Sequence, residues 1–165
     1  MTNDEFDRFT WKTSGARFNA SARLLQRNRL ALYGAASLSL AATLLALSGH
    51  HWTNYAASVA SAFAVVFSLI EAAADHGVKS ERLQQCAVRI RALMYQAKQP
   101  EADIAHLYQQ YEQAIAECPE NHLFMDAWLV EHPKEGFRYS LYSYGLYWAV
   151  IFCAMALIVI GLLTQ

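Results

Sequence analysis

The residues of this sequence that could do chemistry form a polar stripe within an otherwise apolar segment. Successive members are four, three, seven, three and four residues apart, which places them on one face of an α-helix. Polar groups are costly in hydrocarbon, so this face should meet protein or water. If several copies surround an axis, the stripe would line a pore with an acidic inner mouth that favours cations. The members are Asn54, Ser58, Ser61, Ser68, Glu71 and Asp75.

Close helix packing is the alternative explanation of the stripe. Small residues four apart let two helix backbones approach each other, and packing is the more frequent reason for such a pattern. Packing and pore lining can also coexist. The small pairs are Ala57/Ser61, Ala60/Ala64 and Ala64/Ser68, with Gly145/Ala149/Cys153 further along the chain.

Patterns typical of catalysis or metal binding are missing from the sequence. There is no glycine-rich phosphate loop, no nucleophile elbow and no HExxH motif. His50 and His51 are adjacent, so their side chains diverge on a helix, and Pro119 separates Cys118 from His122. We therefore expect no enzyme activity, no cofactor and no metal site.

The distribution of charge shows which elements position the stripe. Residues 30–70 and 139–165 contain no Asp, Glu, Lys or Arg, although the 165-residue chain carries 27 such residues with a net charge of -1. About 20 apolar residues cross a bilayer as a helix. We predict spans at residues 30–49, 52–70 and 141–163, the first two joined as a tight hairpin. Near-zero net charge argues against direct nucleic-acid binding.

All 13 Lys and Arg residues fall in residues 1–29 and 71–138, on one side of this three-span arrangement. The positive-inside rule then predicts a multi-pass membrane protein with a cytoplasmic N terminus and an external C terminus. The expected domains are an amphipathic helix (1–29), a transmembrane hairpin (30–70), a cytoplasmic helical hairpin (71–138) and a third transmembrane helix (139–165).

Residues 4–29 read as an amphipathic helix with a candidate interruption at Ser14–Gly15. It could lie on the anionic inner leaflet or pack on the cytoplasmic helices, and the sequence does not favour either. The candidate leaflet-binding residues are Arg17, Arg23, Arg27 and Arg29.

Residues 71–118 predict two antiparallel helical arms, each with one apolar seam, separated by a turn at Pro100. Each arm is short for a free coiled coil, so packing against another subunit would stabilise it. Gly77, which follows the acidic pair, is a candidate hinge, with a helix stop or a packing contact as equal alternatives. The candidate oligomer seam comprises Leu83, Ile90 and Leu93 in the first arm and Ile104, Leu107 and Tyr111 in the second.

The run WKTSGARFNASARLLQRNRLALYGAASLSLAATLLALS at residues 11–48 resembles the N-terminal signature of the SLATT family, the SMODS- and SLOG-associating two-TM effector domains. The resemblance extends over about residues 11–118, and the third span is an addition to the two-span pattern. The fold class expected is therefore an all-α membrane protein.

The resemblance implies a pore-forming effector of bacterial antiphage defence that oligomerises in the inner membrane and permeabilises it on an intracellular signal. It also implies nucleotide second messengers, or sensors, synthetases or reverse transcriptases encoded beside it, as partners. The alternative is a small non-catalytic membrane anchor that recruits a soluble partner through its cytoplasmic helices.

Overall fold

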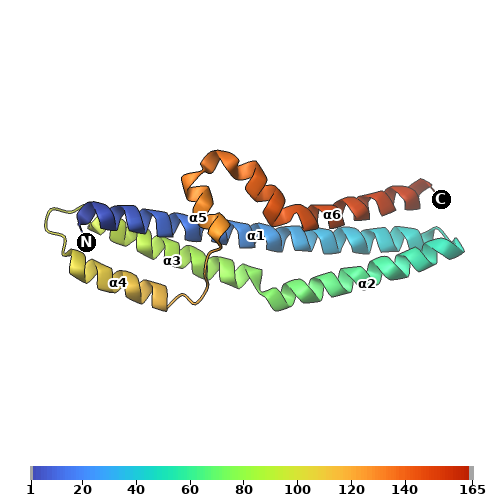
Figure 1. Ribbon diagram of the computed structural model, residues 1–165. Helices are drawn as coiled ribbons and strands as arrows, with labels where there is room; N and C mark the ends of the chain where they lie inside the picture. The colour runs from blue at the N-terminus through green and yellow to red at the C-terminus, as the bar shows by residue number, and fades with distance from the viewer. Residues whose placement is uncertain (1, 164–165) are drawn as a thin grey trace. The chain divides into compact units, whose positions relative to one another are not determined.

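The computed structural model describes residues 2–163, a range that contains helices and no strand (Figure 1). Three helical stretches are long and apolar enough to cross a membrane, Asn3–Leu47, His51–Ala97 and Pro133–Ile160. The predicted class of all-α membrane protein is thereby confirmed. The elements are α1 (Asn3–Leu47), α2 (His51–Ala74), α3 (His76–Gln96), α4 (Ile104–Ala116), α5 (Phe124–Glu131), the 3₁₀ turn η1 (Pro133–Glu135) and α6 (Gly136–Leu163).

The chain divides into two compact units. Unit 1 comprises Met1–Leu25 and Gly77–Tyr139, and unit 2 comprises Gln26–His76 and Ser140–Gln165. The helices α1 and α6 each contribute to both units. The sequence predicts boundaries after residues 29, 70 and 138, and the compact units meet after Leu25, His76 and Tyr139.

Helix α1 runs through Ser14–Gly15 without the interruption that the sequence allows for. The glycine at position 15 serves the packing of α5 within unit 1 and does not break the helix. A Cβ atom at Gly15 would lie 2.9 Å from Cγ2 of Val130, so only glycine lets α5 approach this closely. The conformational cost of a helical glycine is about 1 kcal/mol relative to alanine. This cost is offset here by the close helix contact.

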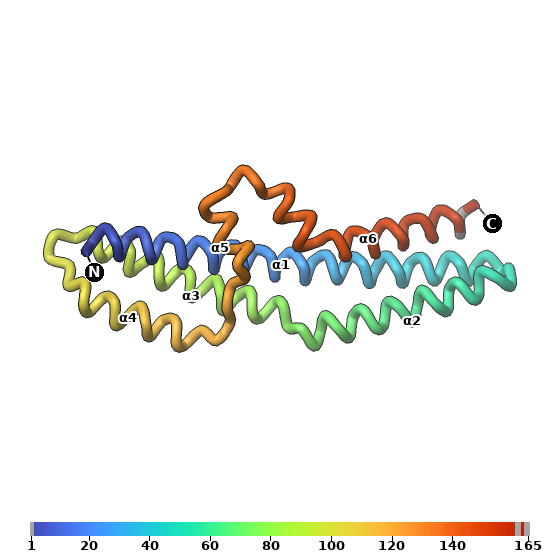
Figure 2. Tube along the Cα trace, in the orientation of Figure 1, coloured from blue at the N-terminus to red at the C-terminus, as the bar shows by residue number. Residues whose placement is uncertain are grey.

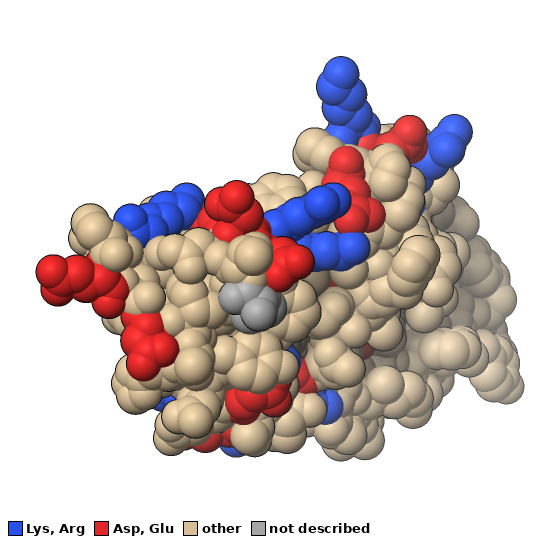
Figure 3. All heavy atoms as spheres, turned by 60° about the vertical axis from the view of Figure 1, so that its left-hand side comes forward, with Lys and Arg blue, Asp and Glu red and all other residues tan. Residues whose placement is uncertain are grey.

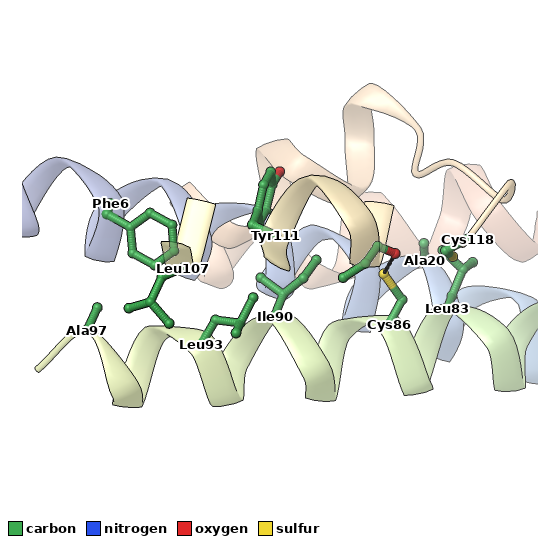
Figure 4. Close-up of a cluster of buried hydrophobic side chains, with 11 residues drawn as sticks. Phe6, Ala20, Leu83, Cys86, Ile90, Leu93, Ala97, Leu107, Tyr111 and Cys118 are labelled. Atoms are coloured by element: carbon green, nitrogen blue, oxygen red, sulfur yellow. Dashed lines mark hydrogen bonds between the residues drawn. The ribbon is translucent and has the colours of Figure 1, made fainter. Parts of the chain in front are cut away.

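The core of unit 1 joins α1, α3 and α4 (Figure 4). Phe6 and Ala20 of α1 pack against the apolar faces of the two arms, and all members of the cluster are less than a tenth exposed. The members of the predicted oligomer seam are part of this intramolecular cluster: Leu83, Ile90, Leu93, Leu107 and Tyr111 are buried in it, and Ile104 packs against it.

The prediction of an oligomer seam at these positions is therefore wrong. The periodicity correctly identified the buried face of each arm, but α1 of the same chain covers that face. An apolar stripe does not specify which helix it packs against, because it can pack equally well on any matching helix of the same chain or of another.

The start of α4 is fixed by its N-cap. The Asp103 carboxylate accepts hydrogen bonds from the backbone N–H groups of Ala105 at 3.0 Å and His106 at 3.2 Å. These contacts satisfy donors that have no partner inside the helix. Pro119, shortly after the end of α4, cannot continue the helix.

Unit 2 is a helical hairpin of α1 and α2 with α6 packed on it. The hairpin turns at Gly49, whose φ of 74° lies in the left-handed region that glycine adopts readily (Figure 2). Gly34 of α1 makes room for its neighbours, since a Cβ there would lie 3.2 Å from Phe67 and 3.4 Å from Val150. Two small clusters, centred on Leu30 and Leu38, hold the three helices together.

Candidate functional site

A groove of about 940 Å³ lies between α1 and α2 in the apolar part of unit 2. Its floor contains the small residues Ala42, Ala57 and Ala64, which are buried between the helices. The small alanines pack the two helices together, as the packing interpretation expects. The polar side chains stay on the surface of the groove, as the pore-lining interpretation requires. The polar side chains that line the groove are Ser39 and Thr43 of α1 and Asn54, Ser58, Ser61 and Ser68 of α2, and all six are exposed.

Three of the hydroxyl groups that line the groove donate to their own helices. Ser58 Oγ donates to Asn54 O at 2.9 Å, Ser68 Oγ donates to Ala64 O at 2.8 Å, and Thr43 Oγ1 donates to Ser39 O at 3.0 Å. This bonding to the carbonyl four residues earlier satisfies the donor without water. Because the donor hydrogen is used within the helix, each oxygen presents its remaining lone pairs to the groove. Such a surface offers acceptors to a cation or to water.

Ser39 and Thr43 were missed by the sequence prediction, which considered only the second span. Their signal was available, because they lie four residues apart on the first span and are polar within an apolar run. The groove therefore has polar side chains on both of its walls.

Glu71 and Asp75, the acidic residues of the stripe, have different surroundings. The Glu71 carboxylate is 11% exposed, accepts a hydrogen bond from Tyr147 OH at 2.8 Å and lies 2.7 Å from His76 Nδ1. Asp75 is exposed. Within the stripe, Glu71 is therefore bonded to α6 through Tyr147, whereas Asp75 faces solvent.

The helix break after the second span lies at Asp75, and Gly77 lies in the first turn of α3. Asp75 has a φ of 52° and ends α2 in the left-handed conformation, which aspartate tolerates better than most residues. The boundary between the two units falls between His76 and Gly77, and the role of Gly77 as a hinge stays a prediction.

Two of the four predicted leaflet-binding arginines are buried in unit 1. Arg17 is 4% exposed and Arg23 is 5% exposed. Arg29 is exposed, and Arg27 is half-buried and donates from Nε to the backbone oxygen of Ser143 at 3.0 Å. The prediction of lipid contact is wrong for Arg17 and Arg23, because the fold surrounds their guanidinium groups with protein.

Arg23 forms a bidentate ion pair with Asp126 of α5. The distances are 3.0 Å from Nε to Oδ1 and 2.9 Å from Nη2 to Oδ2, and Asp126 is fully buried. The Asp126 carboxylate also accepts from Tyr139 OH and, at 2.7 Å, from the backbone N–H of Leu123. Burial alone would lower the pKa of Arg23, but the hydrogen bonds to Asp126 raise it above its usual range. This cluster fixes α5 and the start of α6 to α1.

Ion pairs join several of the charged side chains on the surface of unit 1. Acidic and basic side chains are interspersed on the face seen in Figure 3. Lys12 lies 2.6 Å from Glu131, Arg82 lies 3.1 Å from Glu120, and Arg89 pairs with Glu117. Lys12, Arg82 and Arg89 therefore each meet a carboxylate of the same chain.

The comparisons with known proteins identify the family. The family model that matches is described as SMODS and SLOG-associating 2TM effector domain family 5, and the match covers residues 2–165. No curated protein and no solved structure matches the chain significantly. The match includes the third span, so it extends beyond the resemblance seen in residues 11–118. The chain therefore belongs to SLATT family 5, whose two-span effector domains are membrane effectors of defence systems.

Proposed function

We propose that the protein is a pore-forming effector of a bacterial antiphage defence system. Copies of the chain associate in the inner membrane and permeabilise it when an intracellular signal, a nucleotide or a partner protein, reaches the helices outside the membrane. The chain itself catalyses no reaction and needs no cofactor in this scheme. Its partners are the lipid bilayer and further copies of the same chain.

The observation that carries this proposal is the groove between α1 and α2. Six exposed polar side chains line it within the apolar segments, where lipid would solvate them poorly. Association of several chains around these grooves would replace lipid by protein or water. The acceptor oxygens of Ser58, Ser68 and Thr43 would then face the passing ion, as in other pores lined by oxygen ligands.

The proposed orientation has unit 1 in the cytoplasm. The 13 Lys and Arg residues all lie in residues 1–29 and 71–138, so the positive-inside rule supports an internal N terminus and an external C terminus. In this orientation the signal is received by the helices of unit 1. Proteins encoded by neighbouring genes, such as a nucleotide synthetase, a nucleotide sensor or a reverse transcriptase, would supply this signal.

Membrane potential in living cells tests the proposal. The chain is expressed with its neighbouring genes, the system is activated by phage infection, and a potential-sensitive dye is read. We expect depolarisation that is lost in Ser61→Leu, because leucine removes an oxygen and fills the groove. Val66→Leu is the matched control, since Val66 is exposed on α2 but does not line the groove. Unchanged polarisation on activation of the wild type would refute pore formation.

A membrane anchor that recruits a soluble partner is the second candidate. It is favoured by exposed apolar side chains at the start of α5, where Leu123 is 47% and Phe124 is 79% exposed. An anchor should be inert when overexpressed and should co-purify with its partner through these residues. A pore former should depolarise cells whether or not Phe124 is replaced by serine, provided that the signal still reaches it.

A further inference from the structure

Cys86 and Cys118 meet around one arginine in unit 1. The Arg17 Nη1 atom lies 3.2 Å from Sγ of Cys86 and 2.9 Å from Sγ of Cys118. Cys86 belongs to α3, Cys118 follows the end of α4, and Arg17 belongs to α1. Both sulfurs therefore contact the same guanidinium nitrogen. Two sulfur atoms far apart in sequence are thus held side by side, at the same end of the core cluster (Figure 4).

A small cavity connects this pair to the surface. It has a volume of about 160 Å³, and both cysteines line it together with Arg82 and Arg89. Each cysteine is itself less than a tenth exposed. The cavity is large enough for a molecule such as hydrogen peroxide, whereas a bulky protein thiol could not enter it.

The surroundings distinguish the two thiols. Burial raises the pKa of Cys86 to about 11, although the nearby charge of Arg17 opposes this shift. Cys86 is therefore a protonated thiol at neutral pH. Cys118 has the shorter contact to Arg17 Nη1, so negative charge that develops on its sulfur lies beside a fixed guanidinium. The Glu120 carboxylate also lies 3.8 Å from this sulfur, and its own charge is paired with Arg82 at 3.1 Å.

We propose that Cys86 and Cys118 form a redox-active dithiol that a hydroperoxide converts into an intramolecular disulfide. The Cys118 thiolate attacks one peroxide oxygen, the O–O bond breaks, and the sulfur becomes a sulfenic acid as hydroxide leaves and takes up a proton. The Cys86 thiol then attacks this sulfur, the S–O bond breaks, and water leaves with the Cys86 proton. Two thiols and one hydrogen peroxide give one disulfide and two water molecules.

The disulfide changes what holds α1 in place. Arg17 is buried, and within the described part of the chain its Nε atom has no hydrogen-bond partner. Its Nη1 atom contacts the two sulfurs and, at 3.4 Å, the backbone oxygen of Glu120. Oxidation converts both thiols into weak acceptors and fixes α3 to the segment behind α4. Peroxide thereby alters the contact through which α1 is attached to both arms.

Peptide mapping of the full-length protein in detergent tests the proposal. The protein is treated with hydrogen peroxide, free thiols are blocked under denaturing conditions, and the chain is digested with trypsin without reductant. We expect residues 83–89 to be linked to residues 99–134, with the loss of two hydrogen atoms. The number of thiols that can be alkylated falls from three to one, because Cys153 remains free.

Three variants make the outcome decisive. Cys153→Ala should retain the link, and Cys86→Ser should lose it and leave a sulfenic acid on Cys118 that a dimedone probe captures. Arg17→Lys should slow formation of the link at least tenfold, because one ammonium group does not replace the guanidinium contact with both sulfurs. The proposal is overturned if both thiols stay alkylatable in the wild type, or if the chains are linked only through Cys153.

Discussion

The Asp126 carboxylate shows how a single residue determines the structure of unit 1. It is fully buried and takes hydrogen bonds from Arg23, Tyr139 and the backbone of Leu123. Removal of one partner from a buried ion pair leaves the other charge buried and uncompensated, and this destabilises the fold more than replacing both partners by apolar residues would.

We predict that Asp126→Asn lowers the free energy of unfolding by about 3–5 kcal/mol. Glu131→Gln is the matched control, because Glu131 pairs with Lys12 at the surface and its loss should cost less than about 1 kcal/mol. Thermal unfolding of both variants in the same detergent checks the difference. Equal shifts of the melting temperature would show that the buried pair does not stabilise the fold.

His122 should make the stability of unit 1 depend on pH. Burial, and then the charge of Arg17, lower the pKa of His122 in the folded chain. The His122 imidazole of the unfolded chain binds a proton at about pH 6.5, whereas that of the folded chain binds it only at lower pH. The free energy of unfolding is therefore highest above pH 6.5 and decreases as the pH falls below it. Melting temperatures from pH 5 to pH 8 check this, and His122→Asn should flatten the slope. His106→Asn, at an exposed position, should leave the slope as it is in the wild type.

The burial of Arg17 and Arg23 could not be read from the sequence. Their spacing on an amphipathic helix suits a membrane surface and a protein core equally. The residue that decides between the two, Asp126, is 103 positions away from Arg23. A lone carboxylate in the apolar run at residues 123–130 was nevertheless a signal for a buried partner.

At the scale of helices, length and periodicity predicted most of the architecture. The spans follow from the requirement for about 20 apolar residues, and the arms follow from seams at helical spacing. The position of the break between α2 and α3 did not follow, because the sequence pointed to Gly77 whereas Asp75 adopts the left-handed conformation. Aspartate tolerates this conformation, so a helix can end at Asp75 without a glycine at the break.

The contact between α1 and α5 gives a prediction at the same scale. A methyl group at Gly15 would collide with Val130, at 2.9 Å from Cγ2 and 3.1 Å from Cγ1. We expect Gly15→Ala to destabilise the protein by about 1 kcal/mol, as overpacking outweighs the better helix propensity of alanine. Gly136→Ala is the control, since a Cβ atom there meets nothing within 4 Å.

Rescue separates overpacking from other causes of instability. Val130→Ala added to Gly15→Ala removes the two colliding methyl groups, so the double variant should be more stable than the sum of the single effects. Chemical denaturation of the four proteins of this cycle measures the interaction energy. Strict additivity would contradict the proposed collision.

At the scale of the whole molecule, the sign of the charge predicts the orientation. In a cysteine-free variant, His50→Cys lies in the hairpin turn of unit 2 and Glu101→Cys lies between α3 and α4. An impermeant maleimide added to spheroplasts should label residue 50 and reach residue 101 only after lysis. Labelling of residue 101 in intact spheroplasts would reverse the proposed orientation.

Cysteine accessibility along α2 tests the proposed pore lining most directly. Single cysteines at positions 58, 61 and 68, and at 59, 63 and 66 as controls, are placed in a cysteine-free chain, and membrane vesicles are prepared from cells in which the defence system has been activated. A small charged thiol reagent should modify the first set and reduce ion flux, because only those positions line the polar groove. The second set should stay unmodified in lipid. Equal modification of both sets, or flux that no position affects, would contradict a pore lined by this groove.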